Sequence, residues 1–109
     1  MSISYNFGQE AEKRAADYYR NLGFHILQKN YRYRKAEVDL IVQKEDLLVA
    51  VEVKARSSAY FGDPQSFVSK KKIQLLVMAI DAYVQQRNLD VEVRFVIMSY
   101  VLERGEWKL

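Results

Sequence analysis

The sequence contains no cysteine, one histidine, one proline and four glycines among its 109 residues. The absence of cysteine excludes disulfides, thiol nucleophiles and cysteine-ligated zinc sites. A single histidine excludes metal sites built from paired histidines and leaves one candidate for a catalytic triad. We interpret this residue, His25, as structural, because no second histidine accompanies it. An active site in this chain would therefore be built mainly from carboxylates and cations.

Long apolar runs are also missing. The longest, Leu75 to Ile80, is far too short to cross a membrane, and residues 1–13 contain no apolar stretch of the signal-peptide type. We therefore expect a cytoplasmic protein. Aromatic residues make up 13% of the chain, and half of its residues are apolar, unlike a disordered chain. We predict a single domain, residues 1–109, with its own core.

The first half of the chain is predicted to form a helix and three strands. The helix begins near Asn6, ends at Gly23, and carries apolar residues at helical spacing. Those residues are Ala11, Ala15, Tyr18 and Leu22. Segments 24–34, 38–44 and 47–54 are rich in β-forming residues, and the last two are close enough in sequence to form a hairpin.

The second half is predicted to form a helix and a strand. The helix begins at Asp63-Pro64, a cap followed by a first-turn proline, and ends near Gln86. Its apolar stripe comprises Ile73, Leu76, Val77, Ile80, Tyr83 and Val84. A last strand covers residues 91–102 and is reached by a crossover through this helix. The element order favours a mixed α/β fold, with a central mixed sheet flanked by helices.

The predicted hairpin brings two carboxylates together. A two-residue loop at 45–46 would pair Lys44 with Leu47, and the same register places Asp39 opposite Glu52. Two carboxylates about 4 Å apart repel each other by roughly 4 kcal/mol at an effective dielectric of about 20. Directly opposed like charges destabilise a strand pair, so we expect a compensating positive charge nearby.

Three interpretations of this carboxylate pair remain open from spacing alone. In the same register Glu37 lies opposite Lys54, which shares a face with Glu52. A divalent cation such as Mg²⁺ or Mn²⁺ would bind both carboxylates. Alternatively, Lys54 alone neutralises Asp39 or Glu52 in a structural salt bridge, or the register shifts and the carboxylates face solvent.

The same residues resemble the D…ExK core of the PD-(D/E)XK nuclease superfamily. The two segments that carry the resemblance are EVDLI at 37–41 and VEVK at 51–54. The chain from about Gly8 to Tyr83 further resembles the YraN-like family of bacterial proteins, which are related to archaeal Holliday junction resolvases. The additional residues behind this resemblance are Gly8, Glu12, Gly23, Asn30, Phe61, Gly62, Pro64 and Lys72. The resemblance implies a restriction-endonuclease-like fold.

The resemblance also implies a role for each matching residue. Asp39 and Glu52 would be ligands of Mg²⁺ or Mn²⁺, and the carbonyl of Val53 would be a third ligand. Lys54 would contact or activate the attacking water. Glu12, in the first helix, would complete the water shell of the metal. These residue types suit phosphodiester hydrolysis, which needs a cation, a positioned water and stabilisation of the leaving oxygen.

Basic residues in segment 29–35 are candidates for nucleic-acid binding. Arg32 and Arg34 would lie on one face of a strand, where they could contact phosphates, while Tyr31 and Tyr33 pack inward on the other. An ordinary half-exposed strand shows the same alternation, so both interpretations remain open.

Two further basic positions lie near the predicted site. Arg56, two residues after Lys54, is a candidate phosphate ligand. Among the three lysines at 70–72, only Lys72 is retained, on the basis of the resemblance, and we attribute the others to a solvated helix face. The net charge of +3 is compatible with a polyanionic partner but does not identify one.

These observations lead to one main hypothesis and two alternatives. The main hypothesis is a Mg²⁺- or Mn²⁺-dependent endonuclease acting on DNA, including structured or branched DNA. Because resolution of a symmetric junction needs two cuts, that substrate implies a homodimer. The first alternative is a nucleic-acid-binding accessory module that has the nuclease fold but does not cleave. The second is an interaction domain with an inert ion network.

Overall fold

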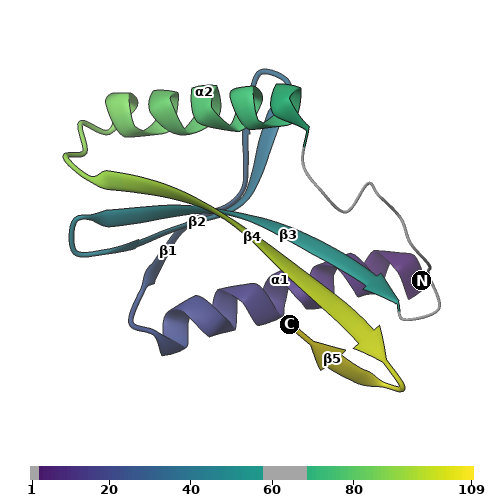
Figure 1. The fold of residues 1–109 in the computed structure, drawn as a ribbon. Coiled ribbons are helices and arrows are strands. Elements are labelled where there is room, and N and C mark those ends of the chain that lie inside the picture. Colours follow the sequence, from purple (N-terminus) through teal and green to yellow (C-terminus); the bar gives the residue numbers. More distant parts are fainter. Residues whose placement is uncertain (1–2, 58–68) are drawn as a thin grey trace.

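The structure, a computed structural model, describes residues 3–57 and 69–109 (Figure 1). Its elements, in chain order, are α1 (Ile3–Asn21), β1 (His25–Tyr33), β2 (Ala36–Lys44), β3 (Leu47–Ser57), α2 (Lys70–Gln86), β4 (Glu92–Glu103) and β5 (Glu106–Lys108). Within the described part of the chain, no helix is both long enough and apolar enough to span a membrane.

The strands form one mixed sheet in the order β1-β2-β3-β4-β5. Tight turns join β1 to β2 and β2 to β3, which run antiparallel, whereas β4 lies parallel to β3 after the crossover through α2. Figure 1 shows α1 on one face of the sheet and α2 on the other. The predicted mixed α/β fold is therefore confirmed. The short strand β5, which pairs with the end of β4, was not predicted.

Two cores form because β2 and β3 are covered on both faces. The core under α1 contains Ala11, Ala15, Ala16, Tyr19, Leu40, Val42, Val49, Val51, Met98 and Tyr100. The core under α2 contains Ala36, Val38, Ile41, Leu48, Ala50, Leu76, Ala79, Ile80 and Tyr83. Double burial explains why both strands are nearly continuous apolar runs in the sequence.

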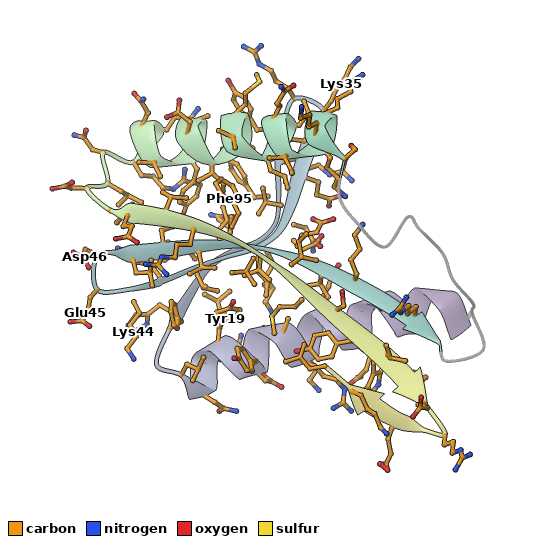
Figure 2. All side chains as sticks on the ribbon, in the orientation of Figure 1. Tyr19, Lys35, Lys44, Glu45, Asp46 and Phe95 are labelled. Carbon is orange, nitrogen blue, oxygen red and sulfur yellow. The ribbon has the colours of Figure 1, made fainter. Side chains whose placement is uncertain are left out.

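The buried helix faces differ in part from the predicted stripes. Tyr18 on α1 and Leu22 directly after this helix are exposed, and Tyr19 points into the core instead (Figure 2). On α2, Ile73 and Val77 are exposed because the helix lies mainly over β2 and β1 and leaves the side toward β4 open. Helical spacing alone could not show how much of the sheet each helix would cover.

The beginning of α2 corrects another prediction. Ser69 has an extended backbone (φ −72°, ψ 159°), so the helix begins at Lys70 and does not continue from Asp63-Pro64. The Ser69 hydroxyl accepts a hydrogen bond from the Lys72 N–H at 3.2 Å, which makes Ser69 the N-cap. Residues 58–64, which include part of the family resemblance, lie outside the described residues. The three lysines at 70–72 thus stand in the first helical turn, where the helix dipole opposes cations.

Candidate active site

The β2–β3 hairpin opens where the predicted site residues lie. The predicted register is confirmed for residues 40–44 paired with 47–51. Backbone pairing stops there, one residue before Asp39 and Glu52, so these two residues are not paired neighbours as predicted. Beyond this point β2 continues along β1 and β3 along β4, and the two strands separate (Figure 1). The backbones of β2 and β3 are therefore not hydrogen-bonded to each other at the predicted site, and we call this place the β2–β3 gap.

The direction of the β2 side chains changes at Asp39. Val38 packs in the core under α2, whereas Leu40 packs in the core under α1. Residues two apart on a regular strand share a face, so the strand must be irregular between them. Opposite this point on β1, Asn30 has a φ of 53°, in the left-handed region that asparagine tolerates better than most residues. Sequence spacing did not predict this irregularity, although an asparagine within a strand pattern is a signal for one.

Asp39 lies in the gap between the strands. Its Oδ2 accepts a hydrogen bond from the backbone N–H of Val53 at 2.7 Å. Burial is the main cause that raises the pKa of the Asp39 carboxyl to about 7, and the Val53 hydrogen bond opposes this shift. Neighbouring negative charges raise the pKa as well, and they belong to Glu52, Glu12 and Glu37. The carboxylates of Glu52, Glu12 and Glu37 are therefore close enough to Asp39 to act on its charge.

Glu52 is the one buried charged side chain among the described residues, with 7% of its surface exposed. Its Oε2 lies 2.5 Å from the Nζ of Lys72 and 3.5 Å from the Nζ of Lys54. The hydrogen bond to Glu52 is the main cause that raises the pKa of Lys72. Two cations, one from α2 and one from β3, thus share one carboxylate oxygen. The salt bridge between Lys54 and Glu52 that sequence spacing allowed is present.

Glu12 reaches the same region from α1. It lines a cleft of about 170 Å³ with Asp39 of β2 and Lys29 of β1. Burial raises the pKa of Glu12, and the charges of Glu37 and Glu52 act in the same direction, whereas Lys29 lowers it. The fold therefore brings Glu12 close to the carboxylates of β2 and β3.

The carboxylates do not by themselves form a complete ligand cage. Within residues 3–57 and 69–109, no three His, Cys, Asp or Glu side chains are arranged to hold a metal ion. A cation bound by Asp39 and Glu52 would need backbone oxygens or water as further ligands. Mg²⁺ commonly binds in this way, through one or two carboxylates and several waters.

The residues predicted to bind nucleic acid lie at several places around these carboxylates. On β1, Arg32 is exposed outward and lies 3.8 Å from Glu37, while Tyr31 and Tyr33 pack toward the α2 core as predicted. Glu37 is thus opposite Arg32 and not opposite Lys54 as predicted, because β2 has already left β3 at this point.

Two more of these basic residues, Arg34 and Arg56, are exposed at the surface. Arg34 lies over the ring of Tyr33 in the β1–β2 turn. Arg56 is exposed on β3, two residues after Lys54. Lys72, the fourth predicted residue, is not on the outer surface with Arg34 and Arg56 but inside the site, on Glu52. Sequence analysis did not predict this contact, because the predicted apolar stripe of the second helix indicated no partner for Lys72.

Comparison with known proteins places the chain in a family. Residues 11–99, which include all the carboxylates described above, match the uncharacterised protein family UPF0102. The chain belongs to the UPF0102 family. A UPF0102 protein of Flavobacterium psychrophilum is 46% identical over 109 residues, which cover all of this chain and 92% of that protein. A UPF0102 protein of Flavobacterium johnsoniae is 48% identical over 110 residues, covering 97% of this chain and 89% of the relative.

More distant UPF0102 relatives also match along most of the chain. The UPF0102 protein of Bacteroides thetaiotaomicron is 37% identical over 109 residues, covering all of this chain and 90% of that protein. The predicted resemblance to YraN-like proteins is therefore confirmed at the level of the family. Since the family name states no activity, the function must be argued from the site.

Proposed function

We propose that this UPF0102 protein is a Mg²⁺- or Mn²⁺-dependent endonuclease that hydrolyses phosphodiester bonds in DNA. The observation that carries the proposal is the gap between β2 and β3. There Asp39 is within electrostatic reach of Glu52, and Lys54 contacts the Glu52 carboxylate. These three residues are the ones that match the D…ExK pattern of the PD-(D/E)XK nucleases.

The donor set in the gap fits a divalent cation. Asp39 and Glu52 would hold it through carboxylate oxygens, and Val53 through its backbone carbonyl, all of them hard oxygen ligands. The fit is supported by the crowding of negative charge, because Glu12, Glu37 and Glu52 all act on the half-buried Asp39 carboxyl. When bound, the cation would supply positive charge to offset the charge that develops on the phosphoryl oxygens.

Residues of the chain would orient the Asp39 carboxylate and position the water and the phosphate. The Val53 N–H fixes the orientation of the Asp39 carboxylate. The side chain of Lys54 is one-third exposed, and its ammonium group lies beside Glu52, from where it can contact the attacking water or the scissile phosphate. Glu12, across the cleft on α1, would hold a water molecule near Asp39. Such positioning lowers the barrier by pre-organising water and charge before the reaction.

The proposed substrate is DNA, with branched DNA as the preferred form, in line with the resemblance to junction resolvases. The exposed Arg32, Arg34 and Arg56 would contact phosphates on either side of the cleaved bond. Two cuts at a symmetric junction would require a homodimer. Because the relatives are bacterial proteins, we assign the activity to the cytoplasm, where bacterial DNA lies.

A second candidate function is a nucleic-acid-binding module that does not cleave. The observation in its favour is the hydrogen bond between Lys72 and Glu52, which occupies a carboxylate oxygen that a metal would use. In that case the carboxylates and lysines would form a permanent ion network and the exposed arginines would hold the nucleic acid.

The two functions are separated by incubating the purified full chain with DNA. Supercoiled, single-stranded and four-way-junction DNA are each tested with Mg²⁺, Mn²⁺ or EDTA. We expect cleavage only with a divalent cation, fastest on the junction, and loss of cleavage in Asp39→Asn and Glu52→Gln. Asp46→Asn, at the far end of the same hairpin, serves as the control and should cut normally (Figure 2).

Two results would count against the endonuclease. Salt-sensitive DNA binding without cleavage under any of these conditions would favour the binding module. Cleavage that persists in both Asp39→Asn and Glu52→Gln would show that the gap between β2 and β3 is not the active site.

A further inference from the structure

Lys72 forms the shortest ion pair in the described part of the chain. Its Nζ lies 2.5 Å from Glu52 Oε2, while the Nζ of Lys54 lies 3.5 Å from the same oxygen. Glu52 is buried and Lys72 is partly buried, so water screens this pair less than the exposed surface pairs. The ammonium group of Lys72 thus neutralises the carboxylate that the proposed metal would need.

The direction of Lys72 is set by the first turn of α2. Lys70 and Lys71, its neighbours on that turn, are exposed, and only Lys72 reaches the β2–β3 gap. The Ser69 cap holds the Lys72 backbone N–H, so the position of this residue is fixed relative to the helix start. A cation in the first turn opposes the helix dipole, and the contact with Glu52 compensates for that opposition.

We propose that Lys72 forms an ion pair with Glu52 until a divalent cation binds there, and that metal binding releases the Lys72 side chain toward the substrate. This inference rests on the proposed function, because it presumes a metal at Asp39 and Glu52. It adds that Lys72, on the helix that follows β3, competes with that metal for the Glu52 carboxylate.

Lys72 and a divalent cation would compete because both bind the Glu52 carboxylate. A divalent cation on the Glu52 carboxylate would lie close to the ammonium group of Lys72, and the two positive charges would repel each other. The Lys72 side chain is 40% exposed, so it has room to leave. It also lines a second cleft with Lys35 and Lys71, in which Glu37 is the one acidic residue. Figure 2 shows Lys35 beside the start of α2, at the edge where a released ammonium could meet a phosphate.

The test compares Mn²⁺ binding to the full-length wild type, Lys72→Met and the matched control Lys71→Met by isothermal titration calorimetry. We expect Lys72→Met to bind Mn²⁺ about tenfold tighter than the wild type, the size expected when a charge-assisted hydrogen bond need not be broken. Lys71→Met should bind like the wild type, because Lys71 does not contact Glu52. Lys72→Gln, which removes the charge but keeps a polar side chain, replaces Lys72→Met if the latter does not fold.

The possible results separate this inference from the proposed function. Equal or weaker Mn²⁺ binding by Lys72→Met, with binding by the wild type intact, overturns the inference and leaves the metal site standing. Absence of Mn²⁺ binding in the wild type and in both Lys72 variants overturns the metal site and the inference together.

A second measurement follows the released ammonium group directly. In wild-type protein, the side-chain NH₃⁺ signal of Lys72 in a ¹⁵N spectrum should shift as Mg²⁺ is added, because its hydrogen bond to Glu52 is lost. The signal should not move in Asp39→Asn, which lacks one of the two metal-binding carboxylates. A Lys72 signal that stays constant while Mg²⁺ binds to the wild type would overturn the inference.

Discussion

In metal-free buffer at pH 8, Asp39→Asn is expected to unfold at a higher temperature than the wild type. The Asp39 carboxyl has a pKa of about 7 in the folded chain against an ordinary value of 3.8, so at pH 8 folding buries a charged group. Asparagine carries no charge and can still accept the hydrogen bond from the Val53 N–H. After allowance for solvent screening, we expect a gain of roughly 1–2 kcal/mol, or about 5 °C in Tm.

The same substitution should change how stability depends on pH. Because the folded-state pKa of Asp39 is raised, the folded protein binds more protons than the unfolded chain between about 3.8 and 7. The contribution of Asp39 is therefore most favourable below its unfolded pKa and is lost as the pH rises through about 7. Wild-type protein in EDTA should gain stability between pH 8 and pH 5, and Asp39→Asn should gain less.

Scanning calorimetry in EDTA across this pH range checks both expectations. Asp46→Asn, an exposed carboxylate in the hairpin turn, controls for the loss of one negative charge and should melt like the wild type (Figure 2). Asp39→Asn should keep part of the dependence of stability on pH, because burial also raises the pKa of Glu12. An Asp39→Asn protein that is less stable than the wild type at pH 8 would contradict the expected crowding of charge. Together with a loss of cleavage, a gain in stability would show that Asp39 is kept at a cost to folding.

The sequence was sufficient to predict a mixed sheet and the β2–β3 register as far as Leu40 and Val51. A two-residue polar loop at 45–46 between two apolar runs allows one pairing that keeps the buried residues of both strands in place, and this pairing is the one observed. The register then predicts which end of the hairpin contains Asp39 and Glu52. Both residues lie within the part of the chain, residues 11–99, that matches the UPF0102 family.

The separation of β2 from β3 was not predictable from spacing. Past Leu40 and Val51, β2 continues along β1 and β3 along β4, so the separation involves the whole sheet and not only the hairpin. The left-handed backbone at Asn30 and the change of side at Asp39 occur at this same point of the sheet. Likewise, the predicted apolar stripe of the second helix did not reveal that Lys72 lies on the buried helix face, four residues before Leu76.

Replacing Lys54 by methionine is expected to lower the rate of metal-dependent DNA cleavage by about 10²–10⁴-fold, the range for loss of one positioned proton-transfer or charge-stabilising group. Unlike Lys72, Lys54 projects from β3 itself, two residues after Glu52, so it remains at the site when the helix side chain leaves. Methionine keeps the length and apolar stem of lysine and removes only the charged, hydrogen-bonding end.

The effect of Lys54→Met on metal binding should be opposite in sign to its effect on cleavage. Removing a cation 3.5 Å from Glu52 leaves the carboxylate more available, so Mn²⁺ should bind at least as tightly as it does to the wild type. Single-turnover cleavage of a labelled junction, measured beside Mn²⁺ titration calorimetry, separates the two quantities, with the exposed Lys70→Met as the control. Cleavage at the wild-type rate would exclude Lys54 from the reaction. A parallel loss of Mn²⁺ binding would mean that Lys54 supports the arrangement of Glu52 and that the rate falls for lack of metal. The expected combination, tight metal binding with slow cleavage, requires that Lys54 acts on the water or on the phosphate.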